Sequence, residues 1–152
     1  HPRDRRQRQM CIRDSIWAQK DKNSAPLQRI QIIKGFYSEK DRETKEHLID
    51  VVCSDGLKPD PMSKLCESNN ATVSTDTCEF SKDKGASELK TVWVDEEYDP
   101  NIETFYYVRV LENPTCRWST WDAIKNNYEP RQGIDEIIQE RAWSSPIWVN
   151  SN

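Results

Sequence analysis

The sequence lacks several features that would place it in a broad class at once. No run within its 152 residues is apolar over anything near 18 positions, which excludes a transmembrane helix. Leu, Ile, Val and Phe together number only 29, and there are only four glycines. Six Trp and five Tyr supply large apolar surfaces instead. We therefore expect a folded domain with a thin core that is rich in aromatic side chains.

Residue patterns that carry catalysis are also missing. Besides His1 there is a single histidine, His47, and the sequence has no H-x-H, HExxH, paired CxxC, glycine-rich phosphate loop or G-x-S-x-G motif. We interpret His47 as a solvated or strand-edge residue. We expect no catalytic residue, metal ligand set or cofactor within this chain. The formal net charge of −4 argues against a nucleic-acid partner.

The beginning of the chain, over residues 1–15, is interpreted as an artefact. Residues 5–14 (RRQRQMCIRD) are the translation of CGT CGG CAG CGT CAG ATG TGT ATA AGA GAC, which resembles the transposase-type adapter DNA used to build sequencing libraries. A basic arm that binds nucleic acid is the competing interpretation. Without residues 1–15 the chain has 17 basic and 24 acidic residues, a net charge of −7, and four cysteines instead of five. We exclude this segment from the prediction of the fold.

Short alternating patterns predict a mainly β protein. Five segments rich in β-branched and aromatic residues predict strands over residues 27–36, 48–53, 88–94, 104–111 and 141–149. Pro146 places the last of these strands at an edge or a bulge. Because helical patterns are few, we expect an antiparallel β-sandwich-like region rather than a barrel.

The segments between these strands predict loops and one helix. Residues 16–23 are expected to be a polar lead-in, residues 38–46 a charged hairpin loop, and Asp95 to Asp99 a solvated acidic turn rather than a calcium site. Ser119 is predicted to be the N-cap of a short helix that runs to Asn127, with Asp122 in its first turn. Residues 134–139 fit either a strand or a helix.

A long loop over residues 54–87 is bordered or occupied by Cys53, Cys66 and Cys78, and a fourth cysteine, Cys116, lies further along the chain. The intervals between Cys53, Cys66, Cys78 and Cys116 are all too long for a common zinc module, and an even count favours two disulfides over free buried thiols. The three pairings cannot be separated by sequence, although we favour Cys66–Cys78 as a local clasp and Cys53–Cys116 as a link from loop to core. Disulfides indicate export to the periplasm or beyond.

The segment from Asn113 to Asp122 gathers aromatic and charged residues after the strongest strand. Trp118 and Trp121 lie three residues apart, so a helix would place them on one face. They could form a platform for a sugar ring, with Arg117 and Asp122 as polar contacts. The alternative, which we favour, is that the Trp pair closes the sandwich core while Arg117 and Asp122 form an ion pair.

Several blocks together resemble a known family. From Ile16 onward the chain resembles the C-terminal part of the bacterial domain-of-unknown-function 3604 family. The blocks that carry the resemblance are RIQIIKGF (29–36), CSDGL (53–57), ELKTVWVDEEYDP (88–100), FYYVRVLENPTCRWSTWDAI (105–124) and IQERAWSSPIW (138–148). Members are several times longer, and their N-terminal parts resemble metal-dependent phosphoesterases of the polymerase-and-histidinol-phosphatase (PHP) type.

The resemblance implies that residues 16–152 are the C-terminal β-rich region of a larger hydrolase. This region would be a non-catalytic accessory, and the divalent metal of the hydrolase would lie in the missing N-terminal domain. That domain, linked in cis, is the expected partner. The resemblance also implies an interdomain role for the block with Glu140, Arg141 and Trp143, whose ordinary interpretation is a charged strand entry. The rival hypotheses are a carbohydrate- or small-ligand-binding sandwich that uses Trp118 and Trp121, and a structural cap without a ligand.

Overall fold

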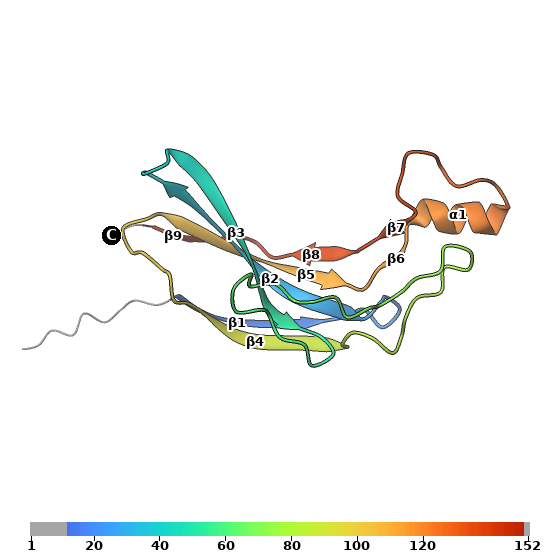
Figure 1. Ribbon diagram of the computed structural model, residues 1–152, viewed down its shortest axis with the longest axis horizontal. Helices are drawn as coiled ribbons and strands as arrows, with labels where there is room; N and C mark the ends of the chain where they lie inside the picture. The colour runs from blue at the N-terminus through green and yellow to red at the C-terminus, as the bar shows by residue number, and fades with distance from the viewer. Residues whose placement is uncertain (1–11, 151–152) are drawn as a thin grey trace, which may run out of the picture.

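The computed structural model describes residues 12–150, and its strands form two main layers (Figure 1). The smaller layer is an antiparallel pair made of β1 (Ile12–Gln19) and β4 (Glu88–Asp95). The larger layer has the strand order β3-β2-β5-β8, and β9 also pairs with β5. Its members are β2 (Leu27–Ser38), β3 (Glu43–Cys53), β5 (Thr104–Glu112), β8 (Arg141–Trp143) and β9 (Ile147–Val149). Every pairing is antiparallel, so the mainly β, sandwich-like prediction is confirmed.

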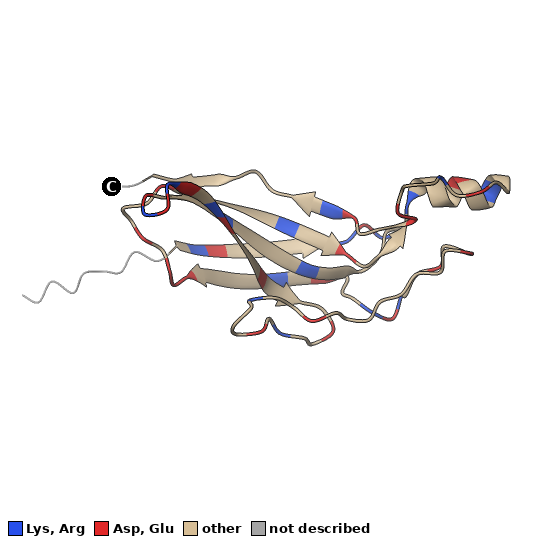
Figure 2. Cartoon of the chain, turned by 45° about the horizontal axis from the view of Figure 1, so that its top comes forward, with Lys and Arg blue, Asp and Glu red and all other residues tan. Residues whose placement is uncertain are grey.

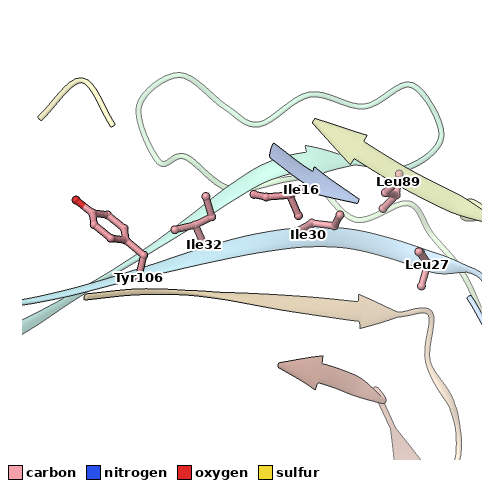
Figure 3. Packing of buried hydrophobic residues seen from close by; sticks show 6 residues of the cluster. All are labelled: Ile16, Leu27, Ile30, Ile32, Leu89 and Tyr106. Carbon is pink, nitrogen blue, oxygen red and sulfur yellow. The ribbon is translucent and has the colours of Figure 1, made fainter. Parts of the chain in front are cut away.

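The core lies between the two layers and is thin, as the composition predicts. The prediction that it is rich in aromatic side chains is wrong, because Tyr106 is the one aromatic residue of the buried cluster and five of the six Trp are exposed. Ile16 and Leu89 reach from the smaller layer onto side chains of β2, as Figure 3 shows. Because side chains alternate across a strand, every second residue of β2 and β5 faces this core and the others face outward. The buried cluster consists of Ile16, Leu27, Ile30, Ile32, Leu89 and Tyr106.

Two segments outside the predicted strands also form strands. Within residues 38–46 only a short turn is unpaired, because β2 runs to Ser38 and β3 begins at Glu43. The charged side chains of this segment point into solvent while its backbone pairs with the neighbouring strand. Their charge therefore does not prevent strand pairing. Residues 16–19 are the second half of β1, which pairs with Glu88–Thr91. That partner is distant along the chain, so the local sequence of the lead-in does not reveal it.

The origin of residues 1–15 stays a prediction. Residues 12–15 form the first half of β1, opposite Val92–Asp95, and residues 1–11 lie outside the described part of the chain. Residues 12–15 also line the apolar groove that is described below.

The two disulfides are present, but their pairing corrects the one we favoured. Cys53 bonds to Cys66, and Cys78 bonds to Cys116. The first bridge ties the start of the long loop back to the end of β3. The second joins the loop to β6 (Thr115–Cys116), which pairs with β7 (Ile137–Ile138). The loop is therefore fastened to regular structure at two places along its path.

The predicted helix forms, although it begins earlier than expected. Helix α1 (Trp118–Asn126) has Arg117 at its N-cap with no side-chain cap, so Ser119 lies within the first turn and is not the cap. No acidic residue lies in the first turn, which places Asp122 beyond it. Asn127 ends the helix in the left-handed conformation, where its N–H reaches the carbonyls of Ala123 and Ile124. The ambiguous segment 134–139 contains the short strand β7.

The last predicted strand is split in two. β8 and β9 both pair with β5, and Pro146 lies in the gap between them. This confirms the edge position, because proline has no N–H to donate to a neighbouring strand. We call β8 and β9 together the C-terminal strand pair. Only one helix occurs among residues 12–150, and it is too short to cross a bilayer.

Candidate functional site

The Trp118–Trp121 pair lies on the surface of α1, away from the sandwich core. The side chain of Trp118 is 68% exposed and that of Trp121 is 49% exposed. Figure 1 shows α1 beyond the end of the two layers, next to β6 and β7. The interpretation that we favoured, in which this pair closes the core, is therefore wrong. The helix instead packs through Thr120 and Ala123, which are buried.

Arg117 and Asp122 do not form the expected ion pair. The Arg117 Nε donates a hydrogen bond of 2.8 Å to the carbonyl oxygen of Asp135, and the Thr120 hydroxyl donates to the carbonyl oxygen of Glu136. Asp122 is exposed, and among residues 12–150 no salt bridge joins it to Arg117. Arg117 therefore holds the return segment before β7 in place instead of flanking the Trp pair.

The C-terminal strand pair is highly exposed although its backbone is paired. Glu140, Arg141 and Trp143 are all exposed, and Trp143 lies opposite Arg109 in the register of β5. In β9, Trp148 lies opposite Phe105 and Ile147 lies opposite Tyr106. Residues 142–149 carry no charged side chain, and Figure 2 shows most of this edge of the larger layer in tan. It is a contiguous stretch of uncharged, largely apolar surface.

An aromatic surface covers the outer side of the larger layer beside β9. We define it by Phe105, Tyr107 and Trp148. The ring centroid of Phe105 lies 4.9 Å from that of Trp148 and 6.4 Å from that of Tyr107. The ring of Phe105 lies directly over Gly35 on β2, where a Cβ atom would come within 2.2 Å of the ring. Glycine is therefore required there for Phe105 to lie across the sheet.

Tyr107 joins this surface to β3. Its hydroxyl donates a hydrogen bond of 3.1 Å to the Glu46 carboxylate. Partial burial and this bond to a carboxylate raise the pKa of the Tyr107 hydroxyl above its ordinary value. Tyr107 thus stays protonated at neutral pH and acts as a hydrogen-bond donor. His47, the neighbour of Glu46, is exposed on the edge strand β3 with its ring edge-on to Phe36 at 5.1 Å.

A buried polar cluster lies between the layers and was missed by the sequence analysis. The Lys34 ammonium on β2 lies 2.6 Å from the Asp95 carboxylate on β4, and the Tyr106 hydroxyl donates to the same carboxylate at 2.7 Å. Burial and the adjacent carboxylate raise the pKa of Tyr106 far above its ordinary value. The prediction of a solvated acidic turn is therefore wrong for Asp95, whose partner comes from a strand much earlier in the chain.

A second polar cluster anchors the long loop. The buried Asn69 side chain donates to Asn113 at 2.8 Å and to Asp55 at 3.0 Å, and the Gly85 N–H also donates to Asp55. Asn113 is fully buried and donates to the carbonyl oxygen of Lys84. All of these groups hold loop and strand backbone together, so the cluster is structural. The only hint in the sequence is the abundance of Asn and Asp in the loop.

An apolar groove of about 650 Å³ opens between β1 and the C-terminal strand pair. Its floor is the inner side of β5 with Tyr106, Val108 and Val110, and its walls include Trp17, Trp93, Trp143 and Ile147. Among residues 12–150 no group of three or more His, Cys, Asp or Glu side chains is placed to hold a metal ion.

Comparison with known proteins gives one match. The sequence matches the model of the family described as "Protein of unknown function (DUF3604)" over residues 6–151, which is nearly the whole chain. The match begins within the segment that we expect to derive from adapter DNA. No curated protein and no solved structure matches.

Proposed function

Because the chain belongs to the DUF3604 family of proteins of unknown function, we propose that it is the non-catalytic C-terminal accessory region of a larger, PHP-like metal-dependent hydrolase. In this proposal the upstream domain supplies the divalent metal and the hydrolytic chemistry. The β-rich region docks against that domain in cis and helps to shape its substrate site.

The observation that carries this proposal is the exposure of the C-terminal strand pair. Trp148 is 68% exposed and Trp143 is 59% exposed, although both lie in strands that pair with the central strand β5. Contiguous exposed apolar surface of this kind marks sites of protein–protein contact. Large aromatic residues are also enriched where interfaces gain most of their binding energy. The pair is therefore suited to contact another domain.

The two disulfides support a location outside the cytoplasm. They are consistent with an extracellular or periplasmic protein, because cytosolic thiols are kept reduced. We propose the periplasm or the cell exterior as the site of action.

The proposal is tested on the parent protein, read from the genomic frame that continues upstream of the Ile16 codon. The parent is expected to hydrolyse a generic phosphoester with Mn²⁺ or Zn²⁺, whereas the chain of 152 residues does not. Trp148→Ser should lower the Tm of the parent more than that of the chain, because only the parent covers this residue. Trp118→Ser is the matched control, since Trp118 is equally exposed at 68% but lies on α1.

Equal effects of Trp148→Ser on the parent and the chain would contradict the docking role. A genomic frame that encodes residues 1–15 behind its own start signal would contradict both the adapter origin and the accessory role. Hydrolysis by the repurified chain alone would contradict its non-catalytic assignment.

A second candidate function is supported by the exposure of Trp118 and Trp121 on one helix. Aromatic rings that are open to solvent can stack on a sugar ring, and in this candidate the chain is a carbohydrate-binding module. Titration with polysaccharides should then give a saturable change in tryptophan fluorescence. The change should be lost in Trp118→Ala while the Tm is kept.

A further inference from the structure

The two layers of the sandwich are unequal in width. The smaller layer has two strands, β1 and β4, whereas the larger layer has β3, β2, β5 and then the C-terminal strand pair. Residues of β1 and β4 cover β2 in the buried core. The inner side of β5, β8 and β9 has no strand of the described residues opposite it, and this uncovered area is the floor of the apolar groove.

The edge of β1 that borders the groove is free. Within residues 12–150, β1 pairs only with β4, so the backbone N–H and C=O groups along its other edge have no partner strand. Exposed strand edges are ready templates for pairing with a further strand. The Trp17 side chain of β1 is not part of this free edge, because its indole N–H donates a hydrogen bond of 3.3 Å to the Glu88 carboxylate on β4.

The dimensions of the groove fit one short strand. A residue in a packed strand occupies roughly 160 Å³, given a rise of about 3.3 Å, a strand spacing of about 4.8 Å and a sheet spacing of about 10 Å. A groove of about 650 Å³ therefore holds about four residues of one strand. A strand beside β1 would also place every second side chain over Val108, Val110 and Ile147.

We propose that the groove receives a β-strand from the upstream part of the parent protein, which pairs with the free edge of β1 and points apolar side chains at β5. This inference rests on the proposed function, since it names the structural contact by which the upstream part joins the accessory region. Recognition by strand addition uses the backbone for affinity and alternate side chains for specificity. The incoming segment is therefore extended, with apolar residues at every second position.

A second copy of the chain does not fit this edge. Two copies paired antiparallel through β1 would be related by a twofold axis perpendicular to the sheet. Both larger layers would then lie on the same side. In each copy the larger layer extends past β1, so β5, β8 and β9 of the two copies would occupy the same space. A single strand avoids this collision.

The test is hydrogen exchange at the backbone amides of residues 16–19 in the chain of 152 residues and in the parent protein. The alternate amides that point away from β4 should exchange freely in the chain and at least 100-fold more slowly in the parent. Ile147→Asp in the parent should restore fast exchange, because it places a carboxylate under the added strand. Val92→Asp is the matched control: Val92 is 50% exposed against 55% for Ile147, but it lies outside the groove.

The outcomes separate this inference from the proposed function. The amides of residues 16–19 could exchange equally fast in both proteins while Trp148 is shielded from acrylamide quenching only in the parent. This result would contradict the proposal of an added strand and leave the docking role intact. Slow amide exchange in the isolated chain would also contradict the proposal of an added strand, because the edge of β1 would then already be covered without the upstream part. If neither the amides nor Trp148 change, or if the genomic frame encodes no upstream domain, both proposals fall.

Discussion

Lys34 and Asp95 form an ion pair that joins the two layers at a separation of 2.6 Å, and both residues are buried. Lys34 belongs to β2 and Asp95 to β4, so the pair links strands that share no backbone ladder. The Lys34 ammonium also donates to the carbonyl oxygen of Glu97 at 3.1 Å. This contact fixes the position of the turn after β4.

Removing one partner of this pair is expected to be strongly destabilising. Asp95→Ala leaves a buried ammonium without its counterion, and we expect a loss of about 3–5 kcal/mol in the free energy of unfolding. Replacing both charges, Lys34→Met with Asp95→Leu, should recover part of that loss. Lys90→Ala, in the exposed pair with Glu88, should cost less than about 1 kcal/mol. Urea unfolding followed by fluorescence measures the free energy of unfolding of all three variants. A double variant no more stable than Asp95→Ala would contradict the role of the unpaired ammonium.

The disulfide connectivity predicts a defined peptide map. Digestion without reductant should release one linked fragment with Cys53 and Cys66 and another with Cys78 and Cys116. Removing the Cys53–Cys66 bridge should cost about 3 kcal/mol and removing the Cys78–Cys116 bridge about 4 kcal/mol, because a longer loop restricts the unfolded chain more. A fragment that joins Cys66 to Cys78 would overturn the pairing.

The contact between Gly35 and Phe105 predicts a double-mutant effect. Gly35→Ala forces the Phe105 ring away from the sheet, and we expect a cost of about 1–3 kcal/mol. In a Phe105→Ala background the same substitution should cost much less, because the ring that it displaces is absent. The four proteins are compared by urea unfolding. Equal costs in both backgrounds would show that the ring does not lie over Gly35.

Asp55 predicts a pH dependence of stability. Burial raises the pKa of this carboxyl, but hydrogen bonds from Ser54, Asn69 and the Gly85 N–H outweigh it and lower the pKa below its ordinary value. A lowered pKa in the folded state adds stability above the unfolded pKa of about 4, and that stability is lost as the pH falls through the folded pKa.

Urea midpoints at several pH values test this sign. Asp55→Asn should lower the midpoint at pH 7, and its midpoint should fall less than that of the unsubstituted chain as the pH is lowered below about 4. Asp76→Asn, at an exposed carboxyl of the same loop, should change neither quantity. An Asp55→Asn variant whose midpoint follows the unsubstituted chain at every pH would contradict the role of the carboxylate.

Local patterns determined most of the strands and the helix. The alternation in residues 104–111 and the Ile-rich run after Leu27 predict β5 and β2, because side chains on alternate faces must differ when one face is buried. The break at Pro146 follows from the missing N–H of proline. The resemblance to DUF3604 carried by the long blocks is confirmed by the family match.

The wrong predictions around α1 share one physical cause. Ser119 is a better cap than Arg117 by residue type, but the start of α1 is set by the bonds from Arg117 and Thr120 to residues 135 and 136. The side of α1 that packs depends on the same contacts. Trp118 and Trp121 therefore remain exposed, although their residue type suggested a core.

By itself, the sequence determined that the chain is mainly β, that its core is thin, and that its cysteines form two bridges. These properties depend on composition and on neighbours within a few residues. Only the tertiary structure decided which cysteines pair, that Lys34 and Asp95 meet in the core, and that one edge of β1 stays unpaired beside an apolar groove. Each of these depends on strand order and register, which bring together residues far apart in the chain and have no local signature.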